Sequence, residues 1–227
     1  MQRFTDRTDA GNRLAAELRG YRGTPGGIVL ALPRGGVVLG AVVARELHLP
    51  FDVCLVRKLG VPWQPELAMG ALAIGEVVVL DDGLLQKLGI PQLEVEREIA
   101  LERQELSRRE RLYRRGRDPL QVSGRTVFLI DDGIATGATM SAAIAAMRRL
   151  GAAKIIVGVG VAPAGTIHRL ARQADTVVSV LEPPYLGAVG EWFEDFPSVE
   201  DATVLALLHP ASAPNPQPAQ EAICESR

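Results

Sequence analysis

The sequence is poor in the residues that build covalent cross-links and metal cages. It has only two cysteines and three histidines among 227 residues, and Cys54 and Cys224 form neither a disulfide framework nor a metal-ligand spacing. His48, His168 and His209 form no pattern with a carboxylate or a cysteine. We therefore predict neither a zinc site nor a catalytic triad, and the sparse cysteines suit a reducing compartment.

Long apolar runs and a charge excess are also absent. No run reaches the ~18 apolar residues needed to span a bilayer, and residues 1–18 lack the apolar centre of a signal peptide. Lys and Arg number 25 against 27 for Asp and Glu, which gives no reason to expect a polyanion or a membrane as partner. The sequence therefore predicts a soluble, cytoplasmic protein in which any anion site is local.

Apolar runs of strand length alternate with segments of helical period, an order typical of parallel βα units. Several runs are apolar at every position, as in strands covered on both faces. We expect strands at 27–32, 52–57, 76–80, 126–131, 153–162 and 176–181, and helices near 8–20, 37–47, 91–115, 138–150, 164–174 and 198–208. With 47% apolar residues, the chain can form one α/β domain over 1–210. Residues 211–227, rich in proline and polar residues, are predicted to be a disordered tail.

The stretch VFLIDDGIATGATM, residues 127–140, joins an apolar strand to an acidic pair, a small loop and a helix. In an open parallel sheet, ligands lie where a strand ends and the first N–H groups of the next helix lack backbone partners. Such N–H groups, with the hydroxyls of Thr136 and Thr139, can bind a phosphate. Asp131 and Asp132 would repel a phosphate and suit vicinal hydroxyls or Mg²⁺ instead. Phosphate and diol together predict a ribose 5-phosphate ligand.

This stretch resembles the signature of the type I phosphoribosyltransferases over its whole length, except that Ala138 stands where many members carry a second glycine. The resemblance implies a parallel-sheet α/β fold with flanking helices, a flap after the second core strand and a small hood. It also implies that Asp131 and Asp132 hold the ribose hydroxyls of phosphoribosyl pyrophosphate. The 5-phosphate would be bound by Ala135, Thr136, Gly137, Ala138 and Thr139.

A second Asp-Asp-Gly occurs at residues 81–83. Bulky residues follow it at 84–87 and offer no phosphate nest. We predict that Asp81 or Asp82 instead caps a short helix.

By the same resemblance, a leaving-group site follows the first core strand, at LPRGG, residues 32–36. The Arg34 guanidinium can bind a phosphate through two N–H groups, and Gly35 and Gly36 expose backbone N–H groups before a helix. A plain strand-to-helix turn capped by glycines is the alternative. Arg57 and Lys58, at the expected carboxyl end of the next strand, could neutralise pyrophosphate in the transition state.

Residues 58–69 are the candidates for the flap, because proline, glycine and small residues fit a movable connection. Trp63 and Glu66 are either flap residues or part of an ordinary loop anchored by a buried tryptophan. The pattern RKLGVPWQPELAMGALA, together with LPRGG, resembles a bacterial and archaeal subgroup over residues 4–205, and that subgroup names no acceptor.

Aromatic residues gather in LEPPYLGAVGEWFEDFPSVED, residues 181–201. Trp192 is the candidate for stacking on a base, with Glu191, Glu194 or Asp195 binding exocyclic donors. Packing of these rings in the core is the alternative.

The predicted helix near 91–115 has an acidic start and an arginine-rich end. A solvated helix whose charges complement its dipole is the expected interpretation. A subunit contact and an anion site for nucleotide or nucleic acid are the alternatives.

The resemblance therefore implies a Mg²⁺-dependent phosphoribosyltransferase of nucleotide metabolism, a glycosyltransferase that moves the 5-phosphoribosyl group to a nitrogenous base and releases pyrophosphate. Asp131 and Asp132 would orient the ribose and share Mg²⁺, while Arg34 and Lys58 would stabilise the leaving group. The alternative is a regulatory protein that binds phosphoribosyl pyrophosphate without transfer. We expect a homodimer, no membrane partner, and no role for nucleic acid as the main partner.

Overall fold

The centre of the structure, a computed structural model that describes residues 3–209, is a five-stranded parallel sheet. Its strands are β1 (Gly27–Ala31), β2 (Phe51–Val53), β6 (Thr126–Gly133), β7 (Lys154–Val161) and β8 (Thr176–Leu181), in the order β2-β1-β6-β7-β8. Every neighbouring pair is parallel. The carboxyl ends of β1 and β6 therefore lie side by side. The predicted tail at 211–227 lies outside the described residues.

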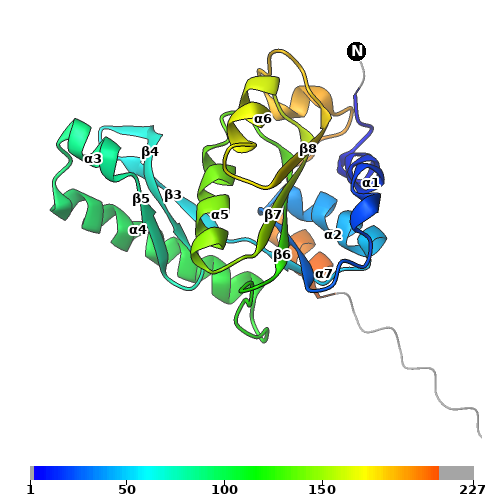
Figure 1. Ribbon diagram of the computed structural model, residues 1–227, viewed down its shortest axis with the longest axis horizontal. Coiled ribbons are helices and arrows are strands. Elements are labelled where there is room, and N and C mark those ends of the chain that lie inside the picture. The colour runs from blue at the N-terminus through cyan, green and yellow to red at the C-terminus, as the bar shows by residue number, and fades with distance from the viewer. Residues whose placement is uncertain (1–2, 210–227) are drawn as a thin grey trace, which may run out of the picture.

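Helices cover both faces of this sheet (Figure 1). On one face lie α1 (Arg7–Glu17) and α2 (Gly36–Leu47), and on the other α5 (Ala138–Arg149) and α6 (Ala164–Leu170). Alternate residues of β6 serve the two faces: Val127 and Leu129 belong to one core cluster, Phe128 and Ile130 to the other. This double burial explains why the strand is apolar at every position.

A second sheet lies to one side of the first and carries two helices of its own (Figure 1). It consists of β3 (Val56–Val61), β4 (Gln64–Ala73) and β5 (Val77–Leu80), all antiparallel. The helices are α3 (Asp82–Leu88) and α4 (Gln92–Tyr113). The sheet packs on α5 of the central layer and on α4.

Two predictions about this region were wrong. The expected strand 52–57 is divided, because β2 ends at Val53 and β3 begins at Val56 in the other sheet. The expected strand 76–80 is antiparallel to β4 and not part of the parallel sheet. Residues 58–69, the flap candidates, form most of the β3–β4 hairpin, and their movement over a substrate stays a prediction.

The second Asp-Asp-Gly begins a short helix, as predicted. The Asp81 carboxylate accepts a hydrogen bond from the backbone N–H of Leu84 at 2.9 Å and so caps α3. Gly89 ends the helix in the left-handed conformation, with φ of 61°. This acidic pair therefore has a structural role.

The N-terminal segment meets residues 192–195 beside the central sheet. Phe4 forms a parallel bridge with Phe193, and its N–H donates to the carbonyl of Trp192 at 2.9 Å. Glu194 N–H donates back to the carbonyl of Phe4 at 2.8 Å. The later of these segments contains a 3-10 turn, η2 (Val189–Trp192), and is followed by α7 (Asp201–Leu208). Within residues 3–209, no helix combines the length and apolar character that crossing a membrane requires.

Two arginines at the end of α4 make structural contacts that the expected solvated helix did not include. Arg114 is only 7% exposed and its Nη2 lies 3.1 Å from the Asp52 carboxylate. Arg117 lies 3.3 Å from the same carboxylate and donates to the carbonyls of Phe51 and Leu208. These arginines join α4 to β2 and α7, whereas Arg115 is exposed.

We expect Arg114→Gln to lower the free energy of unfolding by about 3 kcal/mol, because it leaves a buried Asp52 carboxylate with only Arg117 nearby. Urea denaturation followed by circular dichroism measures the change. Arg115→Gln, one residue away and exposed, is the matched control and should change stability by less than about 0.5 kcal/mol. Equal effects of the two substitutions would contradict a structural role for Arg114.

Candidate active site

The loop between β6 and α5 is shaped by a glycine and by the neighbouring strand. Ile134 N–H donates to the carbonyl of Val161 at 2.9 Å, which ties the start of the loop to β7. Gly137, the N-cap of α5, has φ of 73°, and a Cβ there would lie 3.0 Å from the Thr166 side chain. Only glycine meets both conditions without strain. The loop thus delivers the first turn of α5, with its unpaired N–H groups, to the end of the sheet.

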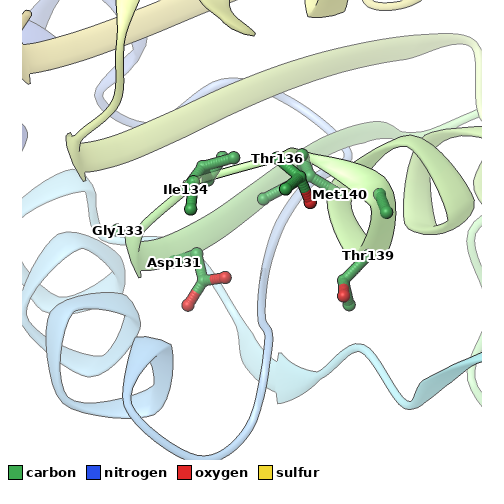
Figure 2. Close-up of a pocket in the computed structure, with 9 residues that line it drawn as sticks. Asp131, Gly133, Ile134, Thr136, Thr139 and Met140 are labelled. Atoms are coloured by element: carbon green, nitrogen blue, oxygen red, sulfur yellow. The ribbon is translucent and has the colours of Figure 1, made fainter. Parts of the chain in front are cut away.

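A pocket of about 130 Å³ lies at this loop. It is lined by Asp131, Gly133, Ile134, Ala135, Thr136, Gly137, Ala138, Thr139 and Met140. Figure 2 shows the Asp131 carboxylate and the Thr139 hydroxyl on the same side of the loop. Thr136 and Thr139 are exposed. The structure therefore places one carboxylate beside the whole predicted phosphate-binding loop, residues 135–139.

Helix α6 supports this loop through two hydrogen bonds. The Thr166 hydroxyl donates to the carbonyl of Ala135 at 2.8 Å, and Arg169 donates to the carbonyl of Thr136. Both donors lie about thirty residues beyond the motif, and no pattern in the sequence marked them. These hydrogen bonds occupy backbone carbonyl groups of the loop, so its N–H groups remain available to a ligand.

The two carboxylates of the acidic pair have different surroundings. Asp132 is 8% exposed, and its Oδ2 lies 2.7 Å from Arg7 Nε. Asp131 is partly exposed and its Oδ1 accepts from the Asp132 N–H at 2.9 Å. Desolvation, and then the neighbouring Asp132 charge, raise the pKa of Asp131 well above its ordinary value. A cation or hydrogen-bond donor in the pocket would favour the charged form of Asp131.

Loop 32–36 lies directly against the acidic pair. Leu32 N–H donates to the carbonyl of Ile130 at 2.9 Å, and the peptide bond between Pro33 and Arg34 is cis. A Cβ on Gly35 would lie 2.0 Å from Asp132 Oδ2, and one on Gly36 would lie 2.9 Å from Asp131 Oδ1. Glycine is therefore required at both positions for close approach. Gly35 is also the N-cap of α2, and a pyrophosphate-binding role for the loop stays a prediction.

Arg34 projects from this loop toward solvent and α7. Its side chain is 47% exposed, and Nη1 lies 3.8 Å from the Asp201 carboxylate. The same carboxylate accepts a hydrogen bond from the Tyr113 hydroxyl at 2.5 Å. Arg34 thus stands at the edge of the candidate site with room to contact a ligand.

Arg57 and Lys58 were expected at the carboxyl end of a parallel strand, and that placement was wrong. Both lie in β3 of the antiparallel sheet. Arg57 bonds to Glu102 of α4, which raises the pKa of Arg57. Consecutive strand residues point to opposite faces, so Lys58 shares a face with its partner Ala71, which lines a groove shared with Ala138 of α5. Neither Arg57 nor Lys58 lines the pocket at loop 135–139, and their contact with a ligand stays a prediction.

The aromatic candidates divide between core and surface. Trp192 is 8% exposed and packs in a cluster that includes Phe4 and Phe193, a position that favours the core-packing alternative. Its contact with a base stays a prediction. Trp63 is 60% exposed at the β3–β4 turn, so the alternative of a loop anchored by a buried tryptophan was wrong.

Comparison with known proteins gives the family. The model of the phosphoribosyl transferase domain matches residues 3–183, which include both loops and all the strands that the structure describes. The chain belongs to the phosphoribosyl transferase family. The predicted type I phosphoribosyltransferase fold, with its parallel sheet and flanking helices, is confirmed.

Proteins similar to this chain include some from Mycobacterium tuberculosis and Thermus thermophilus. Proteins of two Mycobacterium tuberculosis strains, each named "putative phosphoribosyl transferase", are 42% identical over 211 residues, or 92% of this chain. The chain spans about half of their length, 47%. The crystal structure of TT1426 from Thermus thermophilus is also 42% identical, with a TM-score of 0.84, and the match covers 91% of this chain and 98% of that one.

Proposed function

We propose that the protein transfers the 5-phosphoribosyl group from phosphoribosyl pyrophosphate to a nitrogenous base and releases pyrophosphate. The observation that carries the proposal is the pocket in which the Asp131 carboxylate lies beside loop 135–139. A ligand that fits this pair of features has a phosphate and a hydroxyl-bearing sugar. Loop 32–36 lies against the same acidic pair and would bind the pyrophosphate.

Each part of the chain has a distinct task in this proposal. The first N–H groups of α5, with Thr136 and Thr139, bind the 5-phosphate. Asp131 accepts hydrogen bonds from ribose hydroxyls, and Arg34 with the N–H groups of Gly35 and Gly36 binds the leaving pyrophosphate. Displacement at the anomeric carbon passes through an oxocarbenium-like state, so positioning and charge neutralisation supply the rate enhancement.

The acidic pair fits Mg²⁺ only as a site shared with the substrate. Within residues 3–209, no group of three or more acidic, histidine or cysteine side chains could hold a metal alone. Mg²⁺ in phosphate-transfer sites is commonly bound by one or two carboxylates plus substrate oxygens. Asp131, the carboxylate that lines the pocket, would supply the protein's ligand, and bound Mg²⁺ would offset the charge of the pyrophosphate. The homodimer, the cytoplasmic location and the role in nucleotide metabolism stay predictions.

The test is pyrophosphate release from phosphoribosyl pyrophosphate and Mg²⁺ against a panel of purine and pyrimidine bases, with binding followed by calorimetry. We expect release that depends on one base or one class of base. Binding without release for every base would favour the alternative of a phosphoribosyl pyrophosphate-sensing regulator. Absence of binding would overturn both hypotheses.

Thr166→Val should weaken the binding of phosphoribosyl pyrophosphate about fivefold, because it removes the donor that holds the Ala135 carbonyl and keeps the side-chain shape. Calorimetric titration measures the dissociation constant. Thr203→Val, on the exposed side of α7, is the control and should leave the constant unchanged. An unchanged constant for Thr166→Val would show that the Thr166 hydroxyl does not support ligand binding by the loop.

A further inference from the structure

A buried arginine from the first helix holds one carboxylate of the acidic pair. Arg7 is 9% exposed, and its Nε lies 2.7 Å from Asp132 Oδ2. Its Nη1 donates to the carbonyl of Pro197 at 2.6 Å, and its guanidinium lies 3.7 Å from the centre of the Phe196 ring. Three contacts of different kinds thus fix the guanidinium in one position.

The same oxygen of Asp132 is also covered from the side of loop 32–36. The Gly35 backbone is so close that an added Cβ would lie 2.0 Å from Oδ2. Asp132 is buried and is absent from the lining of the pocket at loop 135–139, whereas Asp131 belongs to it. The two neighbouring carboxylates therefore point to different places, one into the protein and one into the pocket.

We infer that Arg7 is a positioning residue, which holds Asp132 beneath loop 32–36 and leaves Asp131 as the carboxylate that meets the ribose hydroxyls. This assignment rests on the proposed function. The sequence motif gives Asp131 and Asp132 the same role in binding the ribose, whereas the assignment gives that contact to Asp131 alone. Arg7 also offsets the charge of Asp132, which would otherwise be buried next to a second carboxylate. Without Arg7, the Asp132 side chain would repel Asp131 or turn outward and displace loop 32–36.

The experiment measures the dissociation constant of phosphoribosyl pyrophosphate with Mg²⁺, by calorimetry on the full chain, for Asp131→Asn, Arg7→Gln and Arg7→Gln/Asp132→Asn. Titrations at about 0.5 M salt screen long-range attraction between the ligand and the altered charges. We expect Asp131→Asn to weaken binding about a hundredfold and Arg7→Gln about tenfold. The double variant should bind more tightly than Arg7→Gln, because the second substitution removes the unpaired buried charge.

The effect of adding Asp132→Asn to Arg7→Gln decides whether Asp132 contacts the ribose or is only held in place by Arg7. If Asp132 contacts the ribose, adding Asp132→Asn to Arg7→Gln will weaken binding further, and the positioning role is overturned. Arg114→Gln breaks the other buried Arg–Asp pair, away from the site, and should lower stability without changing the dissociation constant. A wild-type protein that does not bind phosphoribosyl pyrophosphate would refute the proposed function itself, and the positioning role with it.

Discussion

Asparagine at both positions of the acidic pair, Asp131→Asn with Asp132→Asn, is expected to reduce base-dependent pyrophosphate release about a thousandfold while the protein stays folded. The new amide at position 131 can still occupy the pocket, but it lacks the negative charge that strengthens hydrogen bonds from ribose hydroxyls and that Mg²⁺ requires. The new amide at position 132 keeps an oxygen that can accept from Arg7 Nε. Initial rates of pyrophosphate release, with circular dichroism as the check on folding, measure the effect.

The chain provides a matched control in its second Asp-Asp-Gly. Asp81→Asn with Asp82→Asn makes the same chemical change in the same tripeptide, and asparagine caps a helix as well as aspartate does. We expect release rates within about twofold of wild type for this control. A similar loss of activity in both double variants would mean that the effect comes from net charge and not from the pocket.

Gly35→Ala is expected to have the largest effect of any single methyl group in the site. The new Cβ would lie 2.0 Å from Asp132 Oδ2 and 2.7 Å from its carboxyl carbon, so either loop 32–36 or the buried ion pair with Arg7 must move. We expect a loss of about 3 kcal/mol in the free energy of unfolding and at least a hundredfold loss in pyrophosphate release. Urea denaturation and the release assay measure the two losses separately.

Gly165→Ala tests whether any added methyl group would do the same. Gly165 lies in α6, next to Thr166, and a Cβ there would meet no atom within 4 Å. Alanine favours helix, so this variant should be as stable as wild type or slightly more stable. If Gly35→Ala were equally harmless, the close packing of loop 32–36 on Asp132 would not exist in solution.

The sequence predicted the parts of the site that are contiguous in the chain. Residues 127–140 carry a strand, an acidic pair, a loop and a helix start within one stretch, and local rules determine each of these. The glycines at 35 and 36 were predicted to expose backbone N–H groups before a helix, and their close approach to the acidic pair became evident only from the structure. The prediction that Asp81 or Asp82 caps a helix was confirmed, because an aspartate at a helix start can accept a hydrogen bond from a nearby backbone N–H group.

What the sequence could not supply are contacts between distant segments. Arg7, Thr166 and Arg169 meet the site only through tertiary packing, and an isolated Arg or Thr on a helix carries no local mark of its partner. The second sheet was missed for a different reason. Strand β4 is rich in residues of low β propensity, namely proline, glutamate, alanine and glycine, and its pairing with β3 and β5 decides its conformation.

The meeting of Phe4 with Phe193, and of Arg7 with Pro197, has a consequence for biosynthesis. Arg7 is synthesised 190 positions before Pro197, so the early segment must wait for the later one before either contact can form. At ~5–20 residues per second, this delay lasts ~10–40 s. Until then Arg7, the partner of Asp132, lacks its contact with Pro197, and the ligand site of the nascent protein is incomplete. Completion of the acidic pair is therefore tied to translation through residue 197.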